Sequence, residues 1–302
     1  MDPLIDVFTW GDLGRWDELV EGLERRPCLA VLGHPVAHSR SPQMHNPALE
    51  AAGLPGSYVR IELRTEEFSE AMTVLPKLGF LGANVTIPHK GAAFAAVSSM
   101  SEVARRCGAV NTLAFTPEGI AGHNTDAPGL KQALQEAFGI DLADLRILIL
   151  GAGGGAGQAA AVQCAMDGCR RLVLVNRTLA KAERLAADLG DLLPGAGRLL
   201  AITTEEGLLA REIAEADLII NASSVGMKES DPELVPAHLW NSHHRVYDMI
   251  YAPPQTDLLR EAAAAGARTA NGLGMLLWQG ALAFEYWFKQ AAPVEAMRRG
   301  LA

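Results

Sequence analysis

Cysteine is scarce in this chain of 302 residues, and long apolar runs are missing altogether. The four cysteines include no Cys-x-x-Cys pair and are too few for a disulfide framework; they are Cys28, Cys107, Cys164 and Cys169. No apolar stretch approaches the ~18 residues of a membrane span, and the first residues, MDPLIDVFTWGDLG, lack the basic and apolar regions of a signal peptide. These absences predict reduced thiols in a soluble, cytoplasmic protein.

An excess of basic charge is also lacking. The chain has 26 basic against 35 acidic side chains, a net charge of −9, which argues against binding to nucleic acid or to anionic membranes. The apolar fraction of 49% is that of a folded protein. A length near 300 residues favours about two domains.

Short apolar runs alternate with helix-like segments in the first half of the chain. Strands are expected at 27–32, 57–63 and 80–87, and helices at 46–53, with Asn46 as a cap, and 66–78. A second series begins near residue 144, with strands at 145–150, 172–175, 217–221 and 246–250 and a helix at 178–189. The apolar tail 275–290 is expected to be helical and to pack on the first domain. This alternation predicts α/β architecture with mainly parallel sheets.

A glycine-rich turn, GAGGGAG, follows the strand expected at 145–150. Gly151, Gly153 and Ala156 fit the pattern G-x-G-x-x-G/A, in which the first glycine permits a tight turn and the second lets backbone approach a pyrophosphate. The third, small residue allows a helix to pack closely on the strand, and the start of that helix favours phosphate. A dinucleotide site is therefore predicted here.

The end of the next expected strand indicates which dinucleotide is bound. A site for NAD usually has a carboxylate there for the ribose 2′-hydroxyl. This chain instead has Asn176, Arg177 and Thr178, with Lys181 one turn further on. A guanidinium suits a phosphate because of its rigid fork of donors, so NADP is favoured over NAD.

Three polar segments stand out in the first half of the chain. The first, 33–46, carries two hydroxyls, Ser39 and Ser41, that could both hydrogen-bond a small anionic group such as a carboxylate. Its histidines allow a zinc interpretation, but no acidic or thiol partner lies near them in the sequence. The second segment presents Lys90 after a strand, and the third ends at Asp126. A lysine beside an aspartate could transfer protons to and from a substrate.

Together these segments closely resemble the shikimate dehydrogenase family. The matching motifs run in order along the chain: G-x-P-V-x-H-S-x-S-P-x-x-H-N at 33–46, G-A-N-V-T-x-P-x-K at 82–90, G-A-V-N-T at 108–112, G-x-N-T-D-x-x-G at 122–129, G-A-G-G at 151–154, N-R-T at 176–178, N-A-S-x-x-G-M at 221–227, V-x-D-x-x-Y-x-P-x-x-T-x-L-L at 246–259 and G-x-G-M-L-x-x-Q-G at 272–280. The resemblance covers nearly the whole chain.

The resemblance implies a discontinuous fold. A substrate domain with a parallel-rich sheet is expected at 1–126 and 271–302, with a Rossmann dinucleotide domain inserted at 127–270. It also implies the reaction, a reversible NADPH-dependent reduction of 3-dehydroshikimate to shikimate in aromatic amino-acid (chorismate) biosynthesis, with no metal.

The resemblance assigns roles to residues as well. Lys90 and Asp126 match the catalytic pair, and Ser39 and Ser41 match the serines that hold the substrate carboxylate. The remaining substrate contacts would be Thr86, Asn111, Tyr251 and Gln279. The expected NADP(H) contacts are Gly151, Ala152, Gly153, Gly154, Gly155, Ala156, Asn176, Arg177, Thr178, Lys181, Met249 and Gly272.

Other interpretations remain open at this point. A quinate/shikimate dehydrogenase paralogue with relaxed substrate or cofactor use would share most of these motifs. A non-catalytic NADP-binding sensor would have little need of both Lys90 and Asp126, and a metal-dependent alcohol dehydrogenase would use the histidines. The protein is expected to be a monomer or a homodimer. The segment 2–26 is longer than the family's usual start, and an extra helix or an oligomer contact is expected there.

Overall fold

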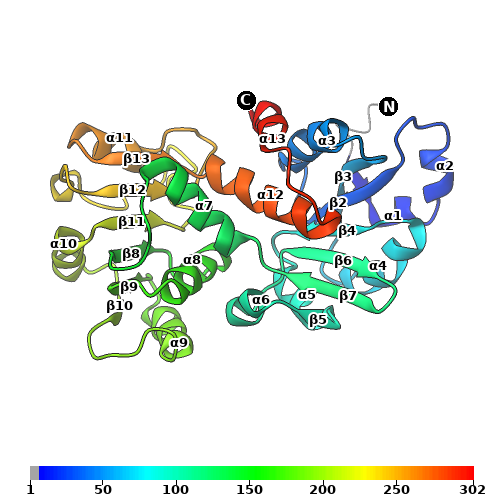
Figure 1. Ribbon diagram of the computed structural model, residues 1–302. Coiled ribbons are helices and arrows are strands. Elements are labelled where there is room, and N and C mark those ends of the chain that lie inside the picture. Colours follow the sequence, from blue (N-terminus) through cyan, green and yellow to red (C-terminus); the bar gives the residue numbers. More distant parts are fainter. Residues whose placement is uncertain (1–6) are drawn as a thin grey trace. The chain divides into compact units, whose positions relative to one another are not determined.

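The computed structural model describes residues 7–302, so residues 1–6, including the start of the unusual N-terminal segment, lie outside the described part of the chain. The described chain divides into two compact units. The N-terminal unit holds the described residues through Thr125 together with Gln279–Ala302, and the central unit is Asp126–Trp278. Each unit has its own sheet flanked by helices, which confirms the α/β class (Figure 1). The predicted domain limits lie after residue 126 and before residue 271, and the substrate and dinucleotide roles of these segments stay predictions.

The N-terminal unit contains a seven-stranded sheet in the order β1-β3-β2-β4-β6-β7-β5. Its strands are β1 (Val7–Thr9), β2 (Pro27–Gly33), β3 (Ser57–Glu62), β4 (Gly82–Val85), β5 (Ser99–Met100), β6 (Thr112–Thr116) and β7 (Gly119–His123). The β6 strand is antiparallel to both its neighbours, β4 and β7, and the other pairings are parallel. The helices of this unit are α1 (Trp10–Leu13), α2 (Trp16–Val20), α3 (Ser41–Ala51), α4 (Phe68–Val74), η1 (Leu75–Leu78), α5 (Lys90–Ala96), α6 (Glu102–Cys107) and α13 (Val294–Leu301).

The central unit contains a six-stranded sheet that is parallel throughout, in the order β10-β9-β8-β11-β12-β13. Its strands are β8 (Arg146–Leu150), β9 (Arg171–Val175), β10 (Leu199–Ile202), β11 (Leu218–Asn221), β12 (Arg245–Asp248) and β13 (Arg268–Asn271). Its helices are α7 (Asp126–Phe138), α8 (Gly155–Met166), α9 (Leu179–Leu189), α10 (Glu206–Glu215), η2 (Ala237–Leu239) and α11 (Asp257–Ala264). This order is that of the doubly wound dinucleotide fold, in which ligands bind where the order reverses, between β8 and β11.

The apolar tail forms one helix, α12 (Leu273–Phe288), as expected. It begins in the central unit and ends in the N-terminal unit, where α13 follows it. Within the N-terminal unit, Trp287 Nε1 donates a hydrogen bond of 2.8 Å to the carbonyl of Leu113, which fastens the end of α12 to β6.

The unusual N-terminal segment is folded from Val7 onward. Its strand β1 lies parallel to β3 at the edge of the sheet, and two short helices follow. Trp16 is 1% exposed, and its ring centroid lies 5.0 Å from that of Phe8 and 5.3 Å from that of Phe80. The helical expectation is thus met, with an added strand that the sequence did not indicate.

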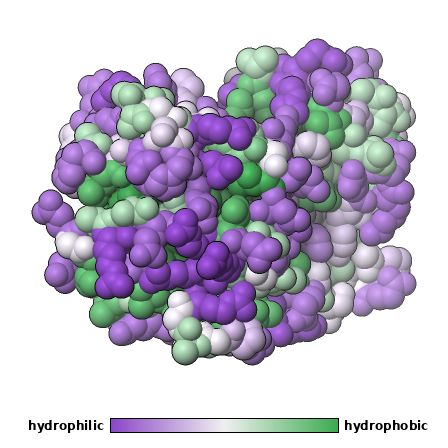
Figure 2. All heavy atoms as spheres, turned by 60° about the vertical axis from the view of Figure 1, so that its left-hand side comes forward, coloured by the Kyte–Doolittle hydropathy of each residue, from purple (hydrophilic) through white to green (hydrophobic). Residues whose placement is uncertain are grey.

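Exposed large apolar side chains are few and scattered over the described residues. They are Leu81, Ile87, Met166, Leu208 and Met227. On the face shown in Figure 2, hydrophobic areas are small and interrupted by hydrophilic side chains. Within residues 7–302, no helix is long and apolar enough to cross a bilayer.

Candidate active site

The two serines of the first motif lie side by side in the N-terminal unit. Ser39 and Ser41 are joined through their hydroxyls at 3.2 Å, and the Ser41 backbone N–H donates to Ser39 Oγ at 3.3 Å. Ser39 is half-buried and Ser41 is 6% exposed. The loop therefore holds the two hydroxyls together, in an arrangement suited to an anionic group with two oxygens.

The helix after this loop begins earlier than expected, so the predicted capping role of Asn46 is wrong. The α3 helix begins at Ser41, because Pro42 fits the first turn of a helix, where a missing N–H costs nothing. Asn46 lies inside the helix and pairs with the backbone of Tyr58. It accepts from the Tyr58 N–H at 2.8 Å and donates to the Tyr58 carbonyl at 2.9 Å. Its side chain joins α3 to β3.

Buried polar side chains continue from β3 across the sheet. The Tyr58 hydroxyl donates to Asn84 Oδ1 at 2.8 Å, and Asn84 Nδ2 donates to Thr112 Oγ1 at 3.1 Å and to the Asn111 carbonyl at 3.3 Å. All four side chains are at most 6% exposed. Burial raises the pKa of Tyr58 well above its ordinary value, although a hydrogen bond with Ser41 lowers it. The phenol is therefore a neutral donor at physiological pH.

Asn111, a predicted substrate contact, lies within this network. Its Nδ2 donates to Thr125 Oγ1 at 3.0 Å, and its Oδ1 accepts from the Thr125 N–H at 2.8 Å. Asp126, the predicted catalytic carboxylate, comes directly after Thr125 and begins α7. The network therefore fixes the backbone from which Asp126 extends. The sequence motifs include Asn84, Thr112 and Thr125, but they did not indicate that these side chains contact one another.

Lys90 is the first residue of α5 and is half-buried. Its carbonyl accepts from the Val110 N–H at 3.1 Å, next to Asn111. The preceding turn is held by the N–H of His89, which donates to the Thr86 carbonyl at 2.9 Å. The His89 ring lies 2.6 Å from the Leu63 carbonyl, and burial lowers its pKa. Hydrogen bonds on both sides therefore hold the turn that carries Thr86 and Lys90.

The glycine turn of the central unit has a backbone conformation that requires glycine and suits a phosphate cradle. Gly151 and Gly153 have φ values of +79° and +98°, which side-chain-bearing residues rarely adopt. A Cβ on Gly151 would lie 2.7 Å from the Ser223 nitrogen, and one on Gly157 would lie 2.6 Å from the Gly151 carbonyl. The close approach of helix to turn therefore falls at Gly157 rather than at Ala156, which is half-buried. The α8 helix begins at Gly155, where a Cβ would meet open space.

The predicted phosphate-binding side chains lie beside this turn. The Asn176 amide donates to the Ala152 carbonyl, and Asn176 Oδ1 accepts from the Thr178 N–H at 2.9 Å. Arg177, Thr178 and Lys181 are exposed. They line a cavity of about 700 Å³ together with Gly151, Gly153, Gly154, Asn176, Ser223 and Ser224. Glu206 and Glu233 also line it, but neither ends β9, where an NAD site has its carboxylate.

A buried carboxylate to which the sequence analysis assigned no role supports the loops after β11 and β12. Asp248 is fully buried and accepts from Asn221 Nδ2 at 3.0 Å, from the Ile250 N–H at 3.0 Å and from Thr256 Oγ1 at 2.7 Å. Burial raises its pKa. Asn221 in turn accepts from the Ser223 N–H at 3.0 Å. The predicted contacts Met249 and Tyr251 follow Asp248 directly, and both are half-buried.

Gly272 supports the same region from β13. A Cβ on Gly272 would lie 2.0 Å from the Met249 carbonyl, so only glycine fits. Gln279, the last predicted substrate contact, is a half-buried residue of α12 and belongs to the N-terminal unit, whereas Tyr251 belongs to the central unit.

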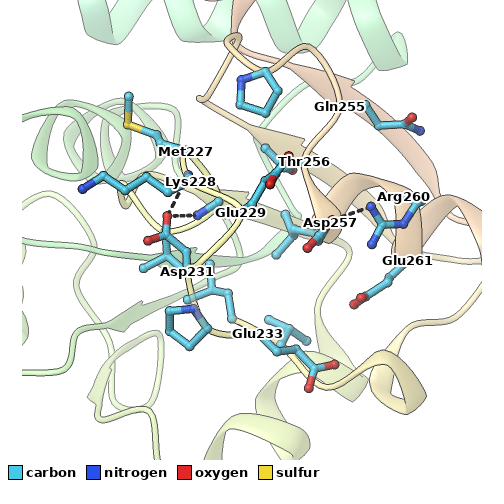
Figure 3. Close-up of a pocket in the computed structure, with 17 residues that line it drawn as sticks. Met227, Lys228, Glu229, Asp231, Glu233, Gln255, Thr256, Asp257, Arg260 and Glu261 are labelled. Carbon is cyan, nitrogen blue, oxygen red and sulfur yellow. Dashed lines mark hydrogen bonds and ion pairs between the residues drawn. The ribbon is translucent and has the colours of Figure 1, made fainter.

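A second cavity of about 560 Å³ lies against the segment 225–235 (Figure 3). Asp231 shapes this segment by accepting from the N–H groups of Gly226, at 2.9 Å, and Lys228, at 3.1 Å. Acidic side chains outnumber basic ones in its lining: Glu229, Asp231, Glu233, Asp257 and Glu261 against Lys228 and Arg260. The glycine turn does not contribute to it. An anionic dinucleotide therefore fits the cavity beside the glycine turn and not this one.

The histidines of the first motif are not arranged as metal ligands. Over residues 7–302, no three His, Cys, Asp or Glu side chains come together as a group that could hold a metal ion. His34 and His38 are exposed, whereas His45 is fully buried and stacks on Tyr58 with ring centroids 4.4 Å apart.

Comparisons with known proteins identify the family of the chain. Three family models match in chain order: the shikimate dehydrogenase substrate binding domain at residues 31–113, shikimate/quinate 5-dehydrogenase at 132–229 and the shikimate 5′-dehydrogenase C-terminal domain at 272–300. A shikimate dehydrogenase (NADP(+)) of Methanopyrus kandleri is 41% identical over 90% of this chain and 94% of its own. The chain belongs to the shikimate dehydrogenase family. The family resemblance and the predicted fold class are both confirmed.

Solved structures of this family have the same fold. Shikimate 5-dehydrogenase of Thermus thermophilus, crystallised with NADP(H) and shikimate, is 38% identical, covers 90% of this chain and 97% of its own, and superimposes with a TM-score of 0.80. Quinate dehydrogenase of Corynebacterium glutamicum, crystallised with NAD, is more distant at 27% identity, with 92% and 99% coverage and a TM-score of 0.81.

Proposed function

We propose that this chain catalyses the reversible NADP-dependent reduction of 3-dehydroshikimate to shikimate. It is an enzyme of the shikimate dehydrogenase family, and its relatives named for NADP support the cofactor. The observation that carries the cofactor choice is the end of β9, where Arg177 and Thr178 stand in place of a carboxylate and line the cavity beside the glycine turn.

The glycine turn fits a dinucleotide in its backbone geometry. The pyrophosphate would be held by backbone N–H groups at the start of α8, where the helix dipole favours negative charge. Arg177, Thr178 and Lys181 would hold the adenosine 2′-phosphate. Asn176 would keep the turn and the strand end together, since it bonds to the backbone of both. When bound, NADPH supplies the hydride that reduces the substrate carbonyl carbon.

In this proposal the N-terminal unit holds the ring acid. Ser39 and Ser41 donate to the carboxylate, and Thr86, Asn111 and Gln279 bind the ring hydroxyls together with Tyr251. Lys90 Nζ donates a proton to the carbonyl oxygen as that oxygen gains negative charge, and Asp126 hydrogen-bonds the substrate and orients Lys90. In the reverse direction, Lys90 takes the proton back from the hydroxyl.

The first experiment follows absorbance at 340 nm while the purified protein oxidises shikimate or quinate, each with NADP or NAD. Turnover of shikimate with NADP is expected. Turnover restricted to quinate or to NAD would overturn the proposed substrate or the proposed role of Arg177. No turnover in a protein that still binds NADPH would favour a sensor.

The catalytic pair is tested by Lys90→Ala. Loss of a general acid–base group typically costs 10²–10⁴-fold in rate, so kcat is expected to fall by about that factor while NADPH still binds. Retained turnover would exclude Lys90 as the proton donor. The biosynthetic role, a cytoplasmic location and the choice between monomer and homodimer stay predictions.

A further inference from the structure

Beneath the serine pair lies a buried cation that neither the motifs nor the proposed roles include. Arg60, in the middle of β3, is 4% exposed. Its Nε and Nη2 both donate to the Ser39 carbonyl, at 2.9 and 2.7 Å, and Nη2 also donates to Gln43 Oε1 at 2.9 Å. The guanidinium thus holds the backbone of Ser39, the residue whose hydroxyl is hydrogen-bonded to that of Ser41.

The alternation of β3 explains how an arginine comes to lie there. Val59 and Ile61 belong to the apolar core on one face of the sheet. Tyr58 and Arg60 occupy the opposite face, since successive side chains of a strand alternate. Tyr58 leads into the polar network through Asn84, and Arg60 leads to the serine loop.

The charge of Arg60 is retained in this position. Burial lowers its pKa, but a guanidinium stays protonated in proteins at physiological pH. Two of its acceptors, the Ser39 carbonyl and Gln43 Oε1, are neutral. A buried cation acts over a longer range than an exposed one, because the surroundings screen it less than water does.

We propose that Arg60 is a positioning residue that also makes the serine pair selective for a carboxylate. It acts through Ser39, by fixing the loop, and its positive charge favours an anionic substituent over a neutral one at the two hydroxyls. The inference rests on the proposed function, in which Ser39 and Ser41 receive the substrate carboxylate.

The test compares an anionic with a neutral ligand. Shikimate and its methyl ester are assayed with saturating NADP, and both are also measured as ligands by calorimetry, so that inactive variants still give an answer. For Arg60→Met, the preference for shikimate over the ester is expected to fall by at least about tenfold, equivalent to about 1.4 kcal/mol. For Arg60→Lys, which keeps the charge but not the fork of donors, the preference is expected to stay within about threefold of wild type, although both ligands bind more weakly.

Arg25 provides a matched control at the other end of β3. It is half-buried and also grips backbone carbonyls, donating to Gly56 at 2.8 Å and to Leu54 at 2.7 Å. Arg25→Met is expected to lower stability and leave the preference between the two ligands unchanged.

Glu62 supplies a test of opposite sign. Its carboxylate accepts from the Val36 N–H at 3.1 Å and lies 3.4 Å from His34 Nδ1, so it holds the other end of the same loop with a negative charge. Glu62→Gln keeps an acceptor and is expected to increase the preference for the carboxylate.

Two outcomes would overturn the inference. If Arg60→Met weakened the binding of shikimate and of its ester equally, and Arg60→Lys showed the same preference as Arg60→Met, Arg60 would have only a structural role. If Arg25→Met changed the preference between the two ligands as much as Arg60→Met does, the assay would report only the stability of the loop. Failure of the wild-type protein to bind or oxidise shikimate would instead refute the proposed function, so the two failures are distinguishable.

Discussion

The two units prepare for their ligands in opposite ways. In the N-terminal unit the candidate site is built from side chains, such as Asn84, Asn111 and Thr112, that are buried and bonded to one another. In the central unit it is built from backbone, because a turn with positive φ at Gly151 and Gly153 leaves N–H groups at the start of a helix. A side-chain network can match the hydroxyl pattern of one ring, whereas a backbone cradle matches any pyrophosphate. Under the proposed function, substrate choice would therefore lie in the N-terminal unit and general dinucleotide binding in the central unit.

The largest effect is expected from breaking the backbone cradle. Gly151→Val puts a β-branched residue at φ +79° with its Cβ 2.7 Å from the Ser223 nitrogen. Strain and overpacking each cost about 1–3 kcal/mol, so urea denaturation should show a loss of about 2–6 kcal/mol. Gly155→Ala, whose Cβ would meet open space, is the control and should not lower the free energy of unfolding.

Breaking the side-chain network should cost less. Asn84→Leu keeps the branched shape of the side chain but leaves the Tyr58 hydroxyl without the acceptor at 2.8 Å and Thr112 without its donor. A buried polar group without a partner costs about 1–3 kcal/mol, which denaturation should detect. Thr178→Ala, an exposed change in the central unit, should stay within about 0.5 kcal/mol of wild type. Equal losses at the two positions would contradict the contrast between the units.

A pH titration tests one buried side chain of the N-terminal unit. Burial lowers the pKa of His45 from 6.5 to about 3, and neither ring nitrogen has a hydrogen-bond partner. Between these values the unfolded chain binds a proton that the folded chain does not, so stability falls as the pH drops below about 6.5. At about pH 5.5 the loss should be roughly 1.4 kcal/mol. His45→Leu should flatten this acid limb, whereas His38→Gln, on an exposed residue, should leave it in place.

The smallest change is expected at the exposed edge of the cradle. Arg177→Gln removes a guanidinium but no buried contact, so the kcat/KM for NADP should fall about tenfold relative to that for NAD, with thermal stability unchanged. Arg184→Gln is the matched control, because Arg184 is also exposed on α9 but does not line the cavity. An unchanged cofactor preference would show that Arg177 does not contact the 2′-phosphate.

The sequence predicted strands most accurately where a strand is buried along nearly its whole length. Strands β2 and β8 are nearly unbroken apolar runs, because both faces of a parallel sheet are covered, and both were predicted within one residue. Strands β7 and β13 were missed, since GIAGH and RTAN have neither an apolar run nor a clear alternation. These segments become strands because they pair with neighbouring strands in the folded sheets.

The site was predicted unevenly for a related reason. The glycine turn was indicated by its spacing between an expected strand and an expected helix, because its chemistry lies in the backbone. Ser39, Ser41, Lys90 and Asp126 were singled out as polar groups, the family resemblance specified their roles, and these roles stay predictions. Arg60 was overlooked because the segment 57–63 was interpreted only as an alternating strand. A charged residue in the middle of such a strand is the signal that could have indicated it. Asp248 ends β12 and belongs to the motif at 246–259, but no role was assigned to it.

The short strand β1 has a consequence for handling the protein. It pairs with Arg60, Ile61 and Glu62, the part of β3 from which the serine loop is held. Without β1, β3 would become an edge strand with unpaired backbone groups, which could pair with a second copy of the chain. Truncating the chain before β2 would thus endanger solubility as well as the anchorage of the serines.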